Sequence, residues 1–161
     1  MKIGALKETS LGERRVALTP DSAVQLQKLG YDCLVEKNSG LAAGFSDEQY
    51  KTVGVEIVGT PKKLTEACDV IVKVLPPSES ELQELSSSKT LISLFYPGSN
   101  EALLLLAKSS ESNVIAMDMV PRISRAQKMD VLSSMANISG YRAVIEAGNN
   151  FGRFFTGQMT A

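Results

Sequence analysis

The chain contains no histidine, and this absence limits the chemistry that it can perform. Without histidine, neither a Ser-His-Asp nor a Cys-His nucleophile can be assembled, and the commonest general base near neutral pH is missing. Any reaction must therefore use arginine, lysine, aspartate, glutamine, serine, tyrosine or a bound cofactor. Cys33 and Cys68 are the only cysteines. They lack the histidines that would complete a zinc site, so we interpret them as buried free thiols.

Long apolar runs and a strong excess of charge are also missing. No apolar run approaches the roughly 20 residues that a membrane helix requires. The net charge of -1 gives no electrostatic reason to expect nucleic acid or an anionic membrane as the main partner. The first ten residues are typical of a strand running into a loop and contain no apolar core of a signal peptide. We therefore expect a cytosolic protein that does not bind nucleic acid.

The rest of the composition is that of an ordinary globular protein. The chain has 161 residues, of which 43% are hydrophobic and 22% are charged, enough to build one sizeable core. Apolar strand-like runs alternate with helical patterns along the first 120 residues, which predicts a doubly wound, mostly parallel α/β sheet with flanking helices. Such a fold is Rossmann- or flavodoxin-like, but here it lacks a Gly-rich loop. The expected strands are 2–6, 31–35, 56–58, 70–75, 90–95 and 114–117.

Local signals place the helices between these strands. Thr19-Pro20 and Thr60-Pro61 pair an N-cap threonine with proline at the first helical position. Ser46 to Gln49 has the spacing of a capping box, and Asn100 is expected to cap a helix through Lys108. From residue 129 to 151, apolar residues recur every three or four positions, which predicts a long amphipathic C-terminal helix. We expect one domain over residues 1–128, followed by this helix and the start of a connection over residues 129–161.

The densest group of polar side chains follows the last expected strand. Residues 121–127 supply Arg122, Arg125 and Gln127, and the helix start adds Asp130 and Ser133. Open α/β folds bind their ligands where strands end and helices begin, so this polar segment is the candidate site. Simpler interpretations remain open. Arg122 and Asp130 would then form a surface ion pair, Ser133 and Ser134 would be small packing residues, and Tyr141 would belong to the core.

The same stretch carries a family resemblance. Residues 121–143 and 151–158 resemble the alpha subunit of proton-translocating NAD(P) transhydrogenases, within the alanine dehydrogenase/transhydrogenase N-terminal domain family. The opening, Lys7-Glu8 followed by residues 13–20 (ERRVALTP), matches both branches of that family. The resemblance implies that this chain is the first lobe of the NAD(H)-binding component. A second, Rossmann lobe with the Gly-rich phosphate loop would begin just after residues 156–160.

The resemblance also implies roles for individual residues. Arg122 and Gln127 would lie by the dihydronicotinamide and its ribose, Asp130 and Ser133 would orient the carboxamide, and Tyr141 would approach from the helix. Hydride would pass directly to NADP+ on a partner NADP(H)-binding domain, beside a membrane domain, with the chain peripheral to the cytoplasmic side of the inner membrane. The uncovered apolar face of the long helix favours self-association, and we expect a homodimer. Because the second lobe is missing, the chain alone is expected to bind NAD(H) weakly and to have no turnover.

Physical chemistry supports one part of this expectation independently. Hydride transfer between two nicotinamides needs no acid or base, only two rings held in contact with water excluded. Oxidation of an amino acid would need a proton acceptor. In alanine dehydrogenases a histidine fills that role at the end of the strand matching residues 90–95, where this chain has Phe95-Tyr96. Arg15 and Lys73 match positions that hold the substrate carboxylate in those enzymes, and here we expect them to line the cleft structurally.

Two other functions remain open. The first is an amino-acid dehydrogenase of the alanine dehydrogenase type, which the shared opening favours and the missing histidine opposes. The second is a non-catalytic module that uses the face of residues 129–155 for dimerisation or docking. Its support is the apolar tail, where Phe154 and Phe155 have no following residues of this chain that would cover them.

Overall fold

A computed structural model describes residues 1–85, 88–153, 155 and 157 and divides the chain into two compact units, Met1–Met119 and Val120–Ala161. The predicted boundary near residue 128 stays a prediction. The serine loop predicted at residues 86–88 lies mostly outside the described residues, as does Phe154 of the tail.

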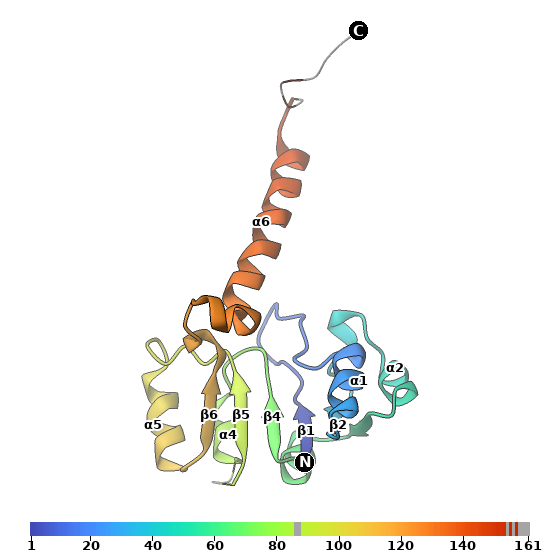
Figure 1. Cartoon of the computed structure of the whole chain (residues 1–161), viewed down its shortest axis with the longest axis vertical. Helices are drawn as coiled ribbons and strands as arrows, with labels where there is room; N and C mark the ends of the chain where they lie inside the picture. The colour runs from blue at the N-terminus through green and yellow to red at the C-terminus, as the bar shows by residue number, and fades with distance from the viewer. Residues whose placement is uncertain (86–87, 154, 156, 158–161) are drawn as a thin grey trace. The chain divides into compact units, whose positions relative to one another are not determined.

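The first unit is built on six parallel strands in the order β3-β2-β1-β4-β5-β6 (Figure 1). The prediction of a doubly wound α/β sheet is confirmed, and every strand pair in the described residues is parallel. The strands are β1 (Lys2–Ala5), β2 (Asp32–Glu36), β3 (Glu56–Val58), β4 (Val70–Val72), β5 (Thr90–Ser93) and β6 (Asn113–Ala116). The order reverses between β1 and β4, and such a switch point is where open α/β sheets bind ligands.

Helices cover both faces of the sheet, because alternate strand residues are apolar on both sides. Leu34 faces a core shared with Leu64 of α3 and Leu82 of α4, whereas Val35 faces a second core shared with Ala23 and Tyr50. The helices of this unit are α1 (Pro20–Lys28), α2 (Asp47–Thr52), α3 (Pro61–Ala67), α4 (Glu79–Gln83) and α5 (Glu101–Ser109), with the short 3-10 helices η1 (Leu41–Ala43) and η2 (Met117–Met119).

Several helix starts follow the predicted chemistry. Thr19 accepts a hydrogen bond from the Ser22 N–H, and Thr60 accepts one from the Lys63 N–H, each just before a proline at the first helical position. Ser46 forms the predicted capping box with Gln49. One prediction is wrong: the Asn100 side chain makes no cap, because its amide donates to the carbonyls of Phe95 and Tyr96 instead.

The second unit consists of a 3-10 helix, η3 (Ser124–Met129), and the long helix α6 (Val131–Asn150). The long helix was predicted, but it begins at Val131 rather than at Lys128 or Met129, because Asp130 caps it. None of its residues is buried, and Ile138, Tyr141 and Val144 are exposed. None of the helices within residues 1–85 and 88–153 is both long and apolar enough to cross a membrane.

Candidate functional site

The polar segment after β6 contains a short helix, which was not predicted. Residues 124–129 form η3, and the Ala126 N–H donates to the Ile123 carbonyl at its start. One short helix thus follows another, with Asp130 between them as the N-cap of α6. This compact turn gathers side chains that are up to 11 positions apart in the sequence, from Arg122 to Ser133.

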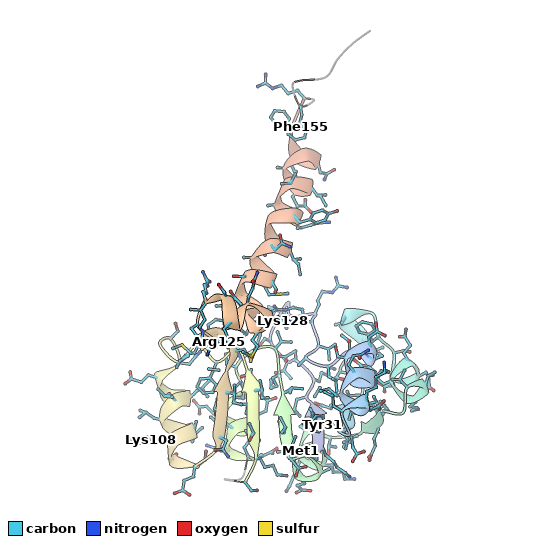
Figure 2. The ribbon with its side chains drawn as sticks, viewed as in Figure 1. Met1, Tyr31, Lys108, Arg125, Lys128 and Phe155 are labelled. Atoms are coloured by element: carbon cyan, nitrogen blue, oxygen red, sulfur yellow. The ribbon has the colours of Figure 1, made fainter. Side chains whose placement is uncertain are left out.

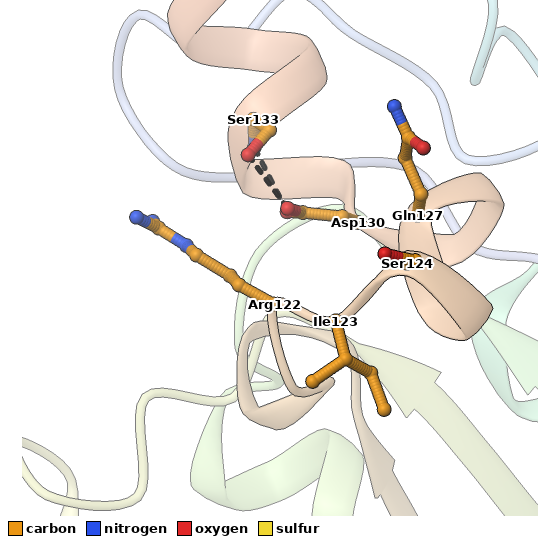
Figure 3. A pocket seen from close by; sticks show the side chains of 6 residues that line it. All are labelled: Arg122, Ile123, Ser124, Gln127, Asp130 and Ser133. Carbon is orange, nitrogen blue, oxygen red and sulfur yellow. Dashed lines mark hydrogen bonds between the residues drawn. The ribbon is translucent and has the colours of Figure 1, made fainter.

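These side chains line one hollow on the surface of the second unit. Its volume is about 310 Å³ and its lining residues are Arg122, Ile123, Ser124, Gln127, Asp130 and Ser133 (Figure 3). Four of the five predicted site residues therefore lie together. Tyr141 does not line this hollow; it is eight residues beyond Ser133, about 12 Å further along a helix axis, and its side chain is 73% exposed.

Asp130 is fixed in the hollow by Ser133. One carboxylate oxygen accepts the Ser133 backbone N–H at 2.9 Å and the other accepts the Ser133 hydroxyl at 2.6 Å. These hydrogen bonds, with a smaller contribution from Arg122, lower the pKa of Asp130 below its ordinary value of 3.8. The side chain is therefore a carboxylate at neutral pH. Among the described residues no salt bridge joins Arg122 to Asp130, so the two charges interact without the direct contact of a surface ion pair.

The cap makes α6 sensitive to acid. Because the pKa of Asp130 is lowered in the folded chain, its contribution is present above about pH 3.8 and is lost as the pH falls through the lowered value. We expect Asp130→Ala to fray the first turn of α6 at pH 7, and acid to do the same in the native chain. Backbone ¹³C chemical shifts of residues 131–134 measure this. Glu146→Ala, near the other end of α6, is the matched control, and unchanged first-turn shifts in Asp130→Ala would contradict the expectation.

The end of α6 has a partial cover from its own tail. The rings of Phe151 and Phe155 stack with centroids 5.2 Å apart, and the Arg153 guanidinium lies 5.6 Å from the centroid of the Phe151 ring. Phe155 lies beside the end of the helix (Figure 2) and remains 57% exposed. The apolar tail is thus largely uncovered in the described residues.

Arg15 and Lys73, the two cations expected to line the cleft structurally, are each paired with a carboxylate. Arg15 lies 2.6 Å from Glu13, and Lys73 lies 2.7 Å from Glu81. The Lys73 side chain is only 2% exposed. Lys73 follows directly on β4, which ends at Val72 rather than at the predicted Leu75. Arg15 and Glu13 also line a second hollow of about 220 Å³ at the carboxyl ends of β1 and β2.

The Glu13–Arg15 pair should make the first unit less stable in acid. Its hydrogen bonds to Arg15 lower the pKa of Glu13 from 4.5 to about 2. The contribution is therefore complete above pH 4.5 and is lost as the pH falls towards 2. Because Arg15 is half-exposed, we expect Glu13→Gln to cost only about 1 kcal/mol at pH 7, and almost nothing near pH 2. Urea denaturation at both values tests this, with the exposed Glu48→Gln as control; equal costs at both values would contradict it.

The turn after β5, at Phe95 and Tyr96, is fixed by side-chain hydrogen bonds to its backbone. The Asp118 carboxylate accepts the backbone N–H groups of Phe95 and Tyr96 at 2.6 and 3.0 Å, and Asn100 donates to the carbonyls of the same two residues. Tyr96 adopts a left-handed φ of 50°, which a tyrosine holds only where its surroundings enforce it.

Some acidic residues that accept backbone N–H groups directly after a strand were not predicted from the sequence. Besides Asp118, Glu8 accepts backbone N–H groups of Val74 and Leu75. The available signal was an acidic residue placed just beyond a strand, but its partner lies 66 positions away and cannot be read from spacing. Within the described residues, no group of three or more histidine, cysteine, aspartate or glutamate side chains is arranged to hold a metal.

Comparison with known proteins identifies the family. Residues 4–139 match the family model described as "Alanine dehydrogenase/PNT, N-terminal domain". The chain is 62% identical over its whole length to NAD(P) transhydrogenase subunit alpha of Cereibacter sphaeroides, covering 31% of that protein. It is 33% identical over 145 residues to alanine dehydrogenase 1 of Staphylococcus aureus, covering 90% of this chain and 38% of that enzyme.

Solved structures agree with the sequence comparison. Transhydrogenase from Sinorhizobium meliloti matches the whole chain with a TM-score of 0.91 and 37% identity, over 48% of its own length. An L-alanine dehydrogenase matches 74% of the chain with a TM-score of 0.71 and 28% identity, over 33% of its length. The chain thus spans less than half the length of these relatives. It belongs to the alanine dehydrogenase/PNT N-terminal domain family, and along its whole length it is similar to transhydrogenase subunit alpha.

Proposed function

We propose that the chain is the N-terminal lobe of the NAD(H)-binding component of a proton-translocating NAD(P) transhydrogenase. In the complete enzyme, hydride passes directly from NADH to NADP+, coupled to proton movement across the membrane. The observation that carries this proposal is the hollow that gathers Arg122, Gln127, Asp130 and Ser133 in one turn. The 62% identity to a transhydrogenase subunit alpha supports the assignment of this hollow to a dinucleotide.

The lining of the hollow fits the nicotinamide end of a dinucleotide. A carboxamide has an N–H₂ donor and a carbonyl acceptor, and the lining offers both complements: the Asp130 carboxylate accepts, and Gln127 can do either. Ser133 fixes the rotamer of Asp130 through two hydrogen bonds, which preorganises the acceptor. Arg122 and Gln127 would lie by the ring and its ribose. Tyr141 lies outside this hollow, so its approach to the ring is the least supported of the proposed contacts.

The residues of this chain would orient the ring rather than transfer protons. NADH supplies the hydride when bound, and no proton leaves or joins the reacting carbons, so no general base is required. The chain has no histidine, and Asp130, with its lowered pKa, is a poor base at neutral pH. The role of Asp130 is to hold the carboxamide and thereby fix the angle of the ring. Orientation of the reacting rings is the main requirement of such a hydride transfer.

Other parts of the proposal concern the whole enzyme. The partners would be an NADP(H)-binding domain and a membrane domain, with the chain on the cytoplasmic side of the inner membrane and the component forming a homodimer. The cofactors would be NAD at the proposed hollow and NADP on the partner. The chain alone would have no turnover, because the diphosphate contacts belong to a second lobe that the 161 residues do not include.

The alternative of an alanine dehydrogenase is favoured by the 33% identity to alanine dehydrogenase 1 of Staphylococcus aureus, and the resemblance implies carboxylate-binding positions at Arg15 and Lys73. Both cations are already paired with Glu13 and Glu81, and Tyr96 stands where a histidine is needed. Production of pyruvate from alanine and NAD+ by a chimera that joins this chain to the remainder of the Cereibacter sphaeroides subunit alpha would establish this alternative.

The alternative of a docking module is favoured by the exposed apolar side chains of α6, including Ile138 and Val144. It makes the polar hollow irrelevant. Transhydrogenation by the same chimera that is unaffected by Arg122→Ala would favour the docking module, whereas a large loss would favour the proposed site.

Calorimetry of NADH binding separates these functions. We expect the 161-residue chain to bind NADH weakly and the chimera to bind it at least about 100-fold more tightly, because diphosphate and ribose contacts supply most of the affinity of a dinucleotide site. Tight binding by the 161-residue chain alone would contradict the proposed division of the site. Absence of binding by both proteins would bring the docking module forward.

A further inference from the structure

The carboxyl edge of the sheet in the first unit carries backbone N–H groups of the kind that bind phosphate in other open α/β folds. In those folds, N–H groups at strand ends and helix starts form an anion site, most often at the switch point of the strand order. Here the switch point lies between β1 and β4. The Lys73 N–H, directly beyond β4, donates to the Ile92 carbonyl, and the next N–H groups along the chain, those of Val74 and Leu75, donate to a side chain instead.

A carboxylate of the chain already occupies these donors. Glu8, three residues beyond β1, accepts the Val74 N–H at 2.6 Å and the Leu75 N–H at 3.4 Å with its two oxygens. One oxygen per N–H is also how a phosphate sits on consecutive amides. Glu8 therefore lies where a bound oxyanion would lie. Burial raises the pKa of Glu8, and the two backbone hydrogen bonds and Lys73 oppose that rise.

The same arrangement recurs at three other strand ends of the described residues. Each time, a carboxylate from a neighbouring element accepts the N–H groups that follow a strand. Glu36 accepts the Lys7 N–H at 2.9 Å after β1, and Asp47 accepts the Asn38 N–H at 2.9 Å after β2. Asp118, which follows β6, accepts two N–H groups after β5. Carboxylates of the chain thus accept several of the N–H groups at this edge.

The neighbouring cations and the first helix provide few further groups that could bind an anion. Lys73 is buried against Glu81 and Arg15 is paired with Glu13. In a phosphate-binding fold the first helix begins directly after β1, but here α1 begins only at Pro20, which has no N–H. The Ser22 N–H in the first turn of α1 is taken by the Thr19 hydroxyl.

We propose that Glu8 is an internal anion that fills the latent oxyanion site at the β1–β4 switch point and excludes phosphate and carboxylate ligands from it. Glu8 is then the residue that prevents this lobe from binding the diphosphate of a dinucleotide by itself. The proposal goes beyond the function proposed above and does not depend on it, because it concerns anion binding to the first unit alone.

The test follows the amide NMR signals of Val74 and Leu75 in the 161-residue chain. In the native chain, pyrophosphate and acetate should leave both signals where sodium chloride of equal ionic strength leaves them. In Glu8→Ala, acetate should shift both signals saturably, and it should raise the Tm of this variant by about 3 °C when it exceeds its Kd several-fold. Glu48→Ala, which removes an exposed carboxylate from α2, is the matched control and should gain no such response.

Either arm can overturn the proposal. Saturable shifts of Val74 and Leu75 with pyrophosphate in the native chain would mean that Glu8 does not exclude anions. A folded Glu8→Ala variant whose two signals respond to acetate no more than to chloride would mean that no oxyanion site lies beneath Glu8. If Glu8→Ala does not fold, Glu8→Ser replaces it, since its shorter side chain also leaves the two N–H groups uncovered. Acetate should then shift the Val74 and Leu75 signals, and no shift beyond that with chloride would refute the proposal.

Discussion

Replacing Gln127 with alanine should slow hydride transfer from NADH to an NADP+ analogue by about 100-fold, which is the size of effect expected when a reacting group is displaced by about 1 Å. Gln127 lines the polar hollow together with Asp130 and Ser133, and its amide is the lining group that can both donate to and accept from a carboxamide or ribose. Its loss would leave the ring free to rotate. The measurement is single-turnover transfer in the chimera with the Cereibacter sphaeroides subunit alpha, combined with the partner NADP(H)-binding domain that carries the NADP+ analogue.

The distribution of the effect matters as much as its size. Because the diphosphate contacts would lie outside this chain, the Kd for NADH should change less than about 5-fold while the transfer rate falls, the pattern of an interaction that matters most in the transition state. Lys128→Ala is the matched control, since Lys128 also lies on η3 but does not line the hollow. A Gln127→Ala variant as fast as the Lys128→Ala variant would remove Gln127 from the site.

Replacing Gly4 with alanine should destabilise the first unit by about 3 kcal/mol, at the upper end of the usual cost of overpacking a core. Gly4 lies on β1, the central strand that joins both halves of the sheet. A Cβ at this position would meet the Cys68 Sγ and the Leu64 Cδ2 at 2.6 Å, and both of these residues are fully buried. Either β1 or α3 would have to shift.

Urea denaturation and thermal melting measure this cost, and we expect the Tm to fall by about 6–12 °C. Gly59→Ala is the control: Gly59 has open space around its would-be Cβ, and the change should alter the unfolding free energy by less than about 0.5 kcal/mol. In a double-mutant cycle, Leu64→Ala should recover part of the Gly4→Ala cost, because the two side chains compete for the same space. Purely additive costs would contradict the steric explanation.

Much of the fold could be predicted because its signals are local. Thr19-Pro20, Thr60-Pro61 and the Ser46 capping box act within four residues, so spacing alone placed the starts of α1, α2 and α3. The apolar runs placed all six strands, and β3 has the predicted bounds. The strand ends were less predictable. The backbone of residues 73–74 still bonds to residues 92–94, but β4 ends at Val72. The Val74 N–H donates to Glu8 instead of to a neighbouring strand.

In the candidate site, too, local features could be predicted from the sequence and distant contacts could not. Arg122, Gln127, Asp130 and Ser133 lie within 12 consecutive residues, so one turn gathers them, and the sequence could indicate their proximity. The 3-10 form of η3 could not be read from composition, because no side-chain cap marks its start. Asn100 was assigned to a cap by residue type, yet the carbonyls of Phe95 and Tyr96 compete successfully for its amide. The carboxylates that close the strand ends act across 9 to 67 positions and depend on the folded sheet.

The central claim is that the hollow around Gln127 receives the nicotinamide end of NAD(H). The most direct measurement compares NADH with ADP-ribose, which lacks the nicotinamide, in the chimera with the Gln127 side-chain amide assigned by NMR. The account predicts that NADH shifts the two Gln127 amide proton signals and that ADP-ribose, bound to saturation, leaves them nearly unchanged. Equal shifts with both ligands, or no shift with either, would contradict the assignment of this hollow to the nicotinamide.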